Sequence, residues 1–342
     1  MTDIRVHMEA EWRTSPEAVR GQPKRLAGPL AELVRCLKRD PPNFVLTCAR
    51  GSSAHAATFG KHLIERYVGI PVAVAAPNIA SVYRQQLKLE GQVLLAISQS
   101  GRSYDLTEFS RMAKSAGAVT VAVVNDVASP LAEICDVVLP MAAGPEHSVA
   151  ATKSFIAALA MLLRITAAWS EVSALSPAIE RLPDRLAFAG ALDWGISLDA
   201  LSPATSLITI GRGPTLAIAR EAALKLKETC YLHAEAFSGA EFQHGPLSLV
   251  SPLYPIIMFM PTDTAAATMR ELVLSLRSKG ATLLCTGSDE AANRLPVLDP
   301  DHPDVDAVCL IQSFYAMVIR LAAMRGIDVD QPRHLQKVTR TR

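Results

Sequence analysis

Short apolar runs alternate with longer stretches of helical composition along most of the chain. In the first half the apolar runs are 43–48, 72–76, 93–97, 120–124 and 137–140. Such runs are long enough for buried strands and too short for helices. The stretches between them, such as 54–67 and 104–116, are rich in helix-forming residues. This alternation predicts an α/β fold with a parallel, doubly wound sheet that is flanked by helices.

The second half repeats the pattern of the first. The apolar run 206–210 ends at Gly211 as the first run ends near Gly51, and 255–260 corresponds to the run 93–97. Gly280 likewise corresponds to Gly117 at nearly the same offset. The economical interpretation is an internal duplication, although repeated βα units can produce similar self-similarity.

The same pattern predicts the division of the chain. We expect an N-terminal helical segment at 1–40, one α/β domain at 41–170, a second at 171–325 and a C-terminal tail at 326–342. The first helix is expected to begin at Ser15, as its cap, with Pro16 in the first turn. An apolar helix over 150–169 would join the halves, and Pro183 marks a looser region after it.

Composition excludes several classes of protein. Lys plus Arg number 34 and Asp plus Glu 33, so the basic excess of a nucleic-acid-binding protein is missing. The six cysteines form no CxxC pair and look reduced, which fits a cytoplasmic protein. The N-terminus lacks the apolar core of a signal peptide, and no uninterrupted apolar run reaches the length of a membrane span.

The segment Ser98–Ser103, with the sequence SQSGRS, lies between a predicted strand and a predicted helix. Backbone N–H groups at a helix start, hydroxyls and a glycine that permits close approach together make a site for a phosphate. An ordinary serine-capped turn is the alternative. The Lys and the spacing of a Walker loop are missing, and so is GxGxxG, which argues against hydride transfer.

A second segment has acid–base character. Glu221, Lys225 and Glu228 are spaced i, i+4 and i+7 in a predicted helix, so their side chains share one face. His244 follows in a turn with Gly245 and Pro246, and histidine is a common general acid and base in enzymes. A carboxylate, an amine and an imidazole can move protons on a sugar. The alternative is a surface Glu–Lys pair beside an ordinary loop histidine.

Two further stretches are less distinctive. The segment 149–153 could add donors to a ligand or could simply start a helix. Glu146 and His147 are adjacent, so their side chains point apart, and no metal site is predicted. Lys337 is a candidate functional residue only if the tail is held over a site. Desolvation there could make its amine a nucleophile.

These segments together resemble the sugar isomerase (SIS) family, and in particular the double-SIS isomerase half of glucosamine–fructose-6-phosphate aminotransferase. The resemblance covers nearly the whole chain. It is carried by SQSG at 98–101, EAALKLKE at 221–228, HAEAF at 233–237, HGPL at 244–247 and DQPRHLQK at 330–337. It implies two tandem SIS domains, each with a flavodoxin-like sheet.

The resemblance also implies roles for individual residues. Residues implied to bind phosphate or substrate are Gly51, Ser52, Ser53, Ser98, Gln99, Ser100, Ser103, Glu146 and Val149. Glu228 would shuttle a proton between C1 and C2, with Lys225 and Glu221 beside it. His244 would assist ring opening in the site of a neighbouring subunit, which implies a homodimer. Lys337 would form a Schiff base with the open-chain ketose, and neither a cofactor nor a metal is required.

Two positions depart from the family pattern. Arg102 replaces the usual acidic residue of the loop, and Ala151 replaces a serine, so both bear on substrate specificity. Only about 40 residues precede the first predicted strand, too few for a glutaminase domain.

We therefore expect an isomerising amino-sugar-6-phosphate deaminase that converts glucosamine 6-phosphate to fructose 6-phosphate and ammonia. A phosphosugar aldose–ketose isomerase, a deglycase and a non-catalytic sugar-phosphate sensor are the alternatives.

Overall fold

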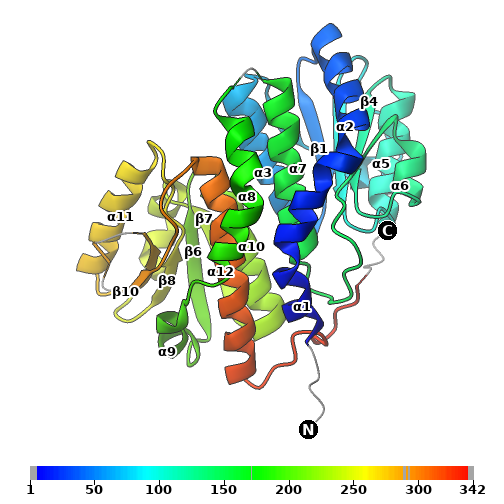
Figure 1. Ribbon diagram of the computed structural model, residues 1–342. Helices are drawn as coiled ribbons and strands as arrows, with labels where there is room; N and C mark the ends of the chain where they lie inside the picture. Colours follow the sequence, from blue (N-terminus) through cyan, green and yellow to red (C-terminus); the bar gives the residue numbers. More distant parts are fainter. Residues whose placement is uncertain (1–5, 171, 288–289, 292, 338–342) are drawn as a thin grey trace. The chain divides into compact units, whose positions relative to one another are not determined.

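The computed structural model describes residues 6–170, 172–287, 290–291 and 293–337 (Figure 1). The chain forms two compact units. The first unit contains 17–146, 153–180 and the chain from Leu335, and the second contains the residues up to Pro16, 147–152 and 181–334.

The first unit is built on a five-stranded sheet in which every pairing is parallel. Its strands are β1 (Val45–Ala49), β2 (Val72–Val74), β3 (Val93–Ser98), β4 (Val119–Val124) and β5 (Val137–Pro140). Their order is β2-β1-β3-β4-β5. The central strand β3 is buried along its whole length, which explains its continuous apolar sequence.

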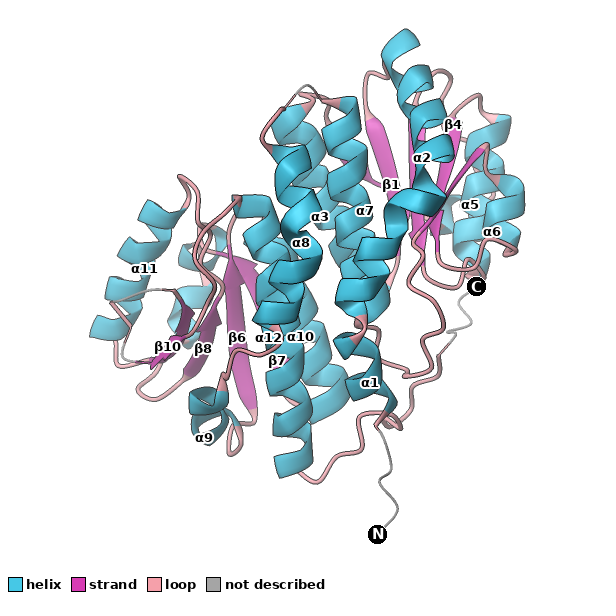
Figure 2. Ribbon diagram, in the orientation of Figure 1, coloured by secondary structure: helices cyan, strands magenta, loops and turns pink. Residues whose placement is uncertain are grey.

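Helices cover this sheet (Figure 2). They are α2 (Ser15–Arg39), α3 (Gly51–Tyr67), α4 (Asn78–Ser81), α5 (Tyr104–Ser115), α6 (Pro130–Ile134) and α7 (Lys153–Trp169). On one face α5 packs Leu106 and Phe109 against Leu94 of the sheet. Elsewhere α3 approaches α7 at Gly60, where an added Cβ would lie 2.9 Å from Leu162 Cδ2. Close packing therefore requires a glycine at that position.

The second unit contains a second parallel five-stranded sheet. Its strands are β6 (Ser206–Gly211), β7 (His233–Ser238), β8 (Pro255–Met258), β9 (Thr282–Thr286) and β10 (Asn293–Leu295). Their order is β10-β9-β8-β6-β7, which repeats the order of the first sheet when strands are counted along each half. The predicted fold class, two flavodoxin-like α/β sheets in tandem, is confirmed.

The helices of the second unit are α1 (His7–Arg13), α9 (Leu198–Leu201), α10 (Thr215–Cys230), α11 (Ala266–Ser278) and α12 (Pro303–Met324), and α8 (Leu175–Ala189) begins in the first unit and ends in the second. Short 3₁₀ turns occur at Gly195–Ser197, Glu241–Gln243 and Pro246–Leu249. α12 is long and apolar enough to cross a membrane, but 72% of its most apolar window is buried inside the protein. Burial of this kind is typical of a core helix.

The structure corrects several predictions. Helix α1 and strands β7 and β10 were not expected from the apolar pattern. Pro183, expected in a looser region, lies inside α8. Helix α2 begins at Ser15 as predicted, but the Ser15 hydroxyl is buried and makes no capping hydrogen bond.

Asp136 offers a test of the first sheet by pH. Burial opposes its ionisation, but hydrogen bonds from Lys114 and Thr120 outweigh burial and hold the pKa of its carboxyl below the ordinary value. Its ionised form therefore stabilises the fold above the ordinary pKa of about 4, and this contribution is lost as pH falls through the lower folded-state pKa. We expect Asp136→Asn to have a lower Tm than wild type at pH 7. The difference in Tm between the two proteins should become smaller as the pH falls.

The control for this experiment is Asp40→Asn, which changes only an exposed pair with Arg39. Its Tm should stay near that of wild type throughout the pH series. A gap for Asp136→Asn that widened in acid would contradict the assignment.

Candidate functional site

The predicted phosphate loop lies at the carboxyl edge of the first sheet. Strands β1 and β3 are neighbours, with Ala49 paired to Ile97, so the segments 50–53 and 98–103 leave the sheet side by side. The strand order places the switch point of the sheet between these two strands. Ligands of open parallel sheets bind in the crevice at this point.

The loop is folded by its own polar groups. The Ser98 hydroxyl accepts a hydrogen bond from the Gly101 N–H at 3.1 Å, and the Ser100 hydroxyl accepts from the Arg102 N–H at 3.3 Å. Gly101 has a φ of +62°, and an added Cβ would lie 2.0 Å from Ser129 Oγ. Only glycine fits at this position, and the tight turn brings backbone N–H groups to the edge of the sheet.

Two helices begin at this edge. α3 starts at Gly51 directly after Arg50, and α5 starts after Ser103, whose hydroxyl makes no capping hydrogen bond. Arg50 binds the buried carboxylate of Asp105 in the first turn of α5, at 2.8 and 2.9 Å. Ser52 and the neighbouring donors therefore lie at helix starts that favour an anion.

Arg102, which departs from the family pattern, has a charged partner. Its guanidinium donates to Asp126 at 2.8 Å, and this hydrogen bond holds the pKa of Asp126 below its ordinary value. Both side chains are well exposed. The positive charge of Arg102 is thus matched locally.

Glu146 and Lys337 meet within the first unit. The Glu146 side chain is fully buried and accepts hydrogen bonds from the backbone N–H and the hydroxyl of Ser154, at the start of α7. Lys337 Nζ lies 3.4 Å from Glu146 Oε2. Lys153 donates to the Pro145 carbonyl at 2.7 Å and closes the same turn. The structure thus brings together two residues that are far apart in sequence and that were both predicted.

The acid–base residues of α10 form one cluster in the second unit. Lys225 is 1% exposed and contacts Glu228 Oε2, while its Nζ lies 3.5 Å from Glu221 Oε1. Glu221 is fully buried, and the Tyr315 hydroxyl on α12 donates to it at 3.4 Å. Glu228 is 21% exposed and is the most solvent-accessible member of this group. The predicted common face is confirmed.

His244 lies in the turn between two 3₁₀ segments, where its backbone N–H donates to the Glu241 carbonyl at 3.0 Å. Its residue is exposed to solvent. Gly245 follows with a φ of +124°, which explains the glycine of the HGP turn.

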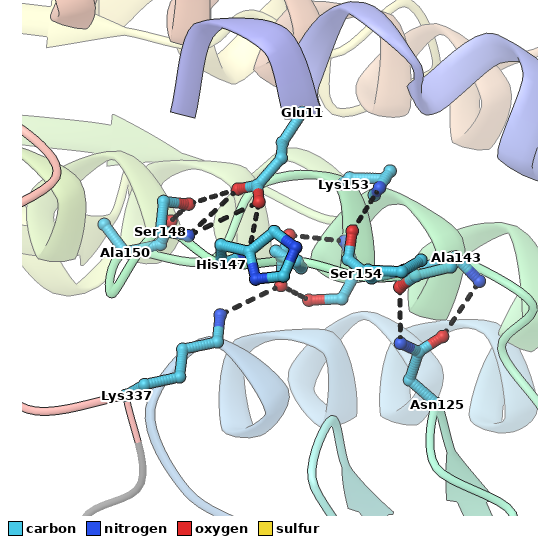
Figure 3. A network of polar contacts seen from close by, with 12 residues as sticks. Glu11, Asn125, Ala143, His147, Ser148, Ala150, Lys153, Ser154 and Lys337 are labelled. Carbon is cyan, nitrogen blue, oxygen red and sulfur yellow. Dashed lines mark hydrogen bonds and ion pairs between the residues drawn. The ribbon is translucent and has the colours of Figure 1, made fainter. Parts of the chain in front are cut away.

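Val149 belongs to the segment 147–152 of the second unit. Glu11 of α1 binds this segment at His147 and Ser148 (Figure 3). The buried Glu11 carboxylate accepts hydrogen bonds from the backbone N–H groups of His147 and Ser148 and from the Ser148 hydroxyl. The rings of His7 and His147 lie 5.7 Å apart. The apparently polar N-terminal segment is therefore part of the structure that positions this loop.

The tail is anchored before it reaches Lys337. Asp330 accepts hydrogen bonds from the N–H groups of His7 and Met8 at 2.6 and 3.0 Å. The Arg333 N–H donates to the Tyr231 hydroxyl at 2.9 Å, and its guanidinium lies 4.2 Å from the centre of the Tyr231 ring. Contacts of this type oppose the fraying that is usual for a chain end.

Sequence reasoning missed Tyr315, Glu11 and Tyr231. The phenol of Tyr315 in an apolar helix is a detectable signal, because a buried hydroxyl needs a partner. Glu11 and Tyr231 carry no such signal. In the parts of the chain that are described, no group of three or more His, Cys, Asp or Glu side chains is arranged to hold a metal ion.

The comparisons with known proteins agree with this geometry. The SIS domain family matches residues 42–168 and 200–295. The chain belongs to the SIS family. It is also 34% identical over 324 residues to glutamine–fructose-6-phosphate aminotransferase (isomerizing) from Symbiobacterium thermophilum, covering 89% of this chain and 52% of that protein. The chain therefore spans about half the length of this curated relative.

Solved structures match this SIS protein over lengths that include both units. A protein from Silicibacter pomeroyi DSS-3 described as a phosphosugar isomerase has a TM-score of 0.90 and 41% identity, over 95% of this chain and 100% of that one. The C-terminal domain of the aminotransferase from Francisella tularensis has a TM-score of 0.85 and 25% identity, over 96% and 99%. Glucosamine-6-phosphate deaminase from Thermotoga maritima, with 22% identity, a TM-score of 0.71 and coverage of 96% and 100%, shares the fold.

Glu11 provides a test of the loop that contains Val149. In Glu11→Gln an amide N–H₂ replaces one acceptor oxygen, so a donor of His147 or Ser148 loses its partner. We expect a loss of about 1–3 kcal/mol in the free energy of unfolding, measured by urea titration.

Glu9→Gln is the matched control on the same helix, because Glu9 makes only an exposed pair with Arg13. Its effect should stay within about 1 kcal/mol. Equal effects of the two substitutions would show that Glu11 does not hold the loop.

Proposed function

We propose that this SIS protein is an enzyme of the phosphosugar isomerase type, and specifically an isomerising amino-sugar-6-phosphate deaminase. The substrate would be glucosamine 6-phosphate and the products fructose 6-phosphate and ammonia. The observation that carries the proposal is the pairing of Lys225 with Glu228, which presents one partly exposed carboxylate at the end of a buried charge cluster.

In the proposed reaction the loop Ser98–Ser103 holds the phosphate, with Ser53 and the start of α3 beside it. Binding of the phosphate fixes the orientation of the sugar and lowers the entropic cost of reaction. His244 assists ring opening, which exposes the aldehyde at C1. These roles rest on the helix starts at this edge of the sheet and on the resemblance to the family.

Glu228 then removes the proton from C2 and returns it to C1. The product of this transfer has a C2=N bond, and water adds to C2 while ammonia leaves. A positioned base of this kind contributes typically about 10²–10⁴-fold to the rate. Water is always available as the co-reactant of hydrolysis, whereas the reverse reaction needs a supply of ammonia. This chemistry favours deamination over amination.

Lys337 would act on the open-chain ketose or its imine as an amine nucleophile. In the structure its ammonium pairs with Glu146, so attack requires Lys337 to give up a proton. Glu146, which pairs with Lys337, is the carboxylate that would accept this proton. We also propose a cytoplasmic location, which fits the six free cysteines.

A plain aldose–ketose phosphate isomerase would use the same proton transfer on an unaminated sugar. The likeness to the Silicibacter pomeroyi protein, described as a phosphosugar isomerase, favours this second candidate. Release of ammonia separates the two functions.

The direct test is an ammonia assay with glucosamine 6-phosphate, on wild type and Glu228→Gln. Wild type should release ammonia and fructose 6-phosphate in equal amounts. Glu228→Gln should lose at least about 10²-fold in kcat and still bind the sugar phosphate with nearly the same Kd, because it lacks only the base.

Glu235→Gln is the control, since Glu235 is an exposed carboxylate on the nearby strand β7. It should retain wild-type turnover. Sugar-phosphate isomerisation without ammonia would establish the second candidate, and loss of binding in Glu228→Gln would contradict the role of that residue.

We further propose a homodimer in which His244 acts in the site of the neighbouring subunit. The exposed position of His244 and the resemblance to the family support this proposal. Mixed after unfolding and refolding, the inactive variants His244→Ala and Glu228→Gln should form hybrid dimers with one intact site. Activity should return to about one quarter of wild type for random pairing. A mixture as inactive as its parents would show that His244 serves its own subunit.

A further inference from the structure

The second sheet has a switch point of its own. Because its strand order repeats that of the first sheet, the two central strands β6 and β8 are neighbours and their following segments leave at one edge. Crevices at such points are the usual ligand sites of open parallel sheets. The proposed reaction uses the switch point of the first sheet for phosphate binding and leaves this second one without a role.

A cavity of about 190 Å³ lies at this edge, within the second unit. Its wall includes 260–262 after β8, 286–287 at the end of β9 and 297–300 after β10. Thr215 at the start of α10 and the first three turns of α12 complete it. This volume can hold several water molecules, which suits a small ligand.

The cavity corresponds in position to the crevice of the first unit. α12 follows β10 as α7 follows β5. The segment that enters α7 carries Glu146, whose carboxylate binds the backbone N–H of Ser154. In the segment that enters α12, the Asp301 N–H donates to the carboxylate of Asp306 at 3.2 Å. Each half thus places a buried carboxylate beside the start of the helix that follows its last strand.

The chemistry of the second crevice does not suit a phosphate. The loop after β8 is Pro261-Thr262-Asp263, where Pro261 has no N–H to donate and Asp263 is acidic. The start of α12 is already capped by His302, which accepts from the Asp304 N–H, and it carries two aspartates in its first turn. The charged side chains of the wall, Arg185 and Arg294 against Asp299 and Asp306, cancel.

The polar side chains in the cavity wall can form hydrogen bonds with the hydroxyls of a ligand. Asp306 accepts hydrogen bonds at 2.8 Å from both Arg185 and the Thr262 hydroxyl. A carboxylate next to a guanidinium offers an acceptor and donors side by side, which matches two neighbouring hydroxyls. Desolvation also raises the pKa of Asp306. The apolar part of the wall contains Leu192, Met260, Val297, Leu298 and Leu310.

We propose that this cavity binds a neutral, unphosphorylated monosaccharide or a polyol of similar size. Its hydroxyls would bond to Asp306, Arg185 and Thr262, and its C–H face would pack on the apolar wall. Pockets of this kind combine a mostly apolar lining with a few placed polar groups. The site is separate from the phosphate loop and needs no turnover to be detected.

The test titrates D-glucose and D-fructose into the full chain labelled at its threonine methyl groups and follows the methyl signals by NMR. The signals of Thr215, Thr262 and Thr286 should shift with saturation. Thr262→Val keeps the shape of the side chain and removes its hydroxyl, so it should weaken binding about fivefold. Ser100→Ala, in the phosphate loop, should leave this binding unchanged.

Several results would overturn the proposal. One is the absence of any shift up to the solubility of the sugars. A second is loss of binding in Ser100→Ala with none in Thr262→Val, which would place the sugar at the phosphate loop. A third is displacement of glucose from these threonines by inorganic phosphate, which would show an anion site.

Discussion

The ammonium of Lys225 is almost completely shielded from water, and this single fact constrains the second unit. A buried charge is tolerated only when it is paired and hydrogen-bonded. Glu221 and Glu228 supply the pairing from the same helix, and Tyr315 supports Glu221 from α12. Two carboxylates share one ammonium. Because Glu221 is fully buried and Glu228 is partly exposed, Glu228 is the carboxylate of this pair that solvent reaches.

The two halves share one architecture and differ in the chemistry at the edges of their sheets. In the first unit the segment after the central strand is SQSGRS, a serine-rich turn in which Gly101 has a positive φ. In the second unit the equivalent segment begins with Pro261 and contains Asp263. Of these two loops, only the first resembles an anion site, so the proposed phosphate binding is assigned to the first unit. The two loops differ although they follow corresponding strands of the two sheets.

The elements that could be predicted from sequence are those whose signal is local. Buried strands such as β3 are continuous apolar runs, and the shared face of Glu221, Lys225 and Glu228 follows from helical periodicity. Strand β7 was missed because His233–Ser238 is an edge strand that contains Ala and Glu rather than β-branched residues. The bond from Ser148 to Glu11 joins residues 137 positions apart. Contacts of this kind depend on packing that no local pattern encodes.

The central claim, that Glu228 moves the proton at C2, is tested most directly by hydrogen exchange. Glucosamine 6-phosphate is incubated in D₂O with wild type or with Glu228→Gln, and the C2 hydrogen is followed by NMR before any product accumulates. The account predicts exchange of the C2 hydrogen by wild type and none above background by the variant. Exchange by Glu228→Gln at the wild-type rate would contradict it.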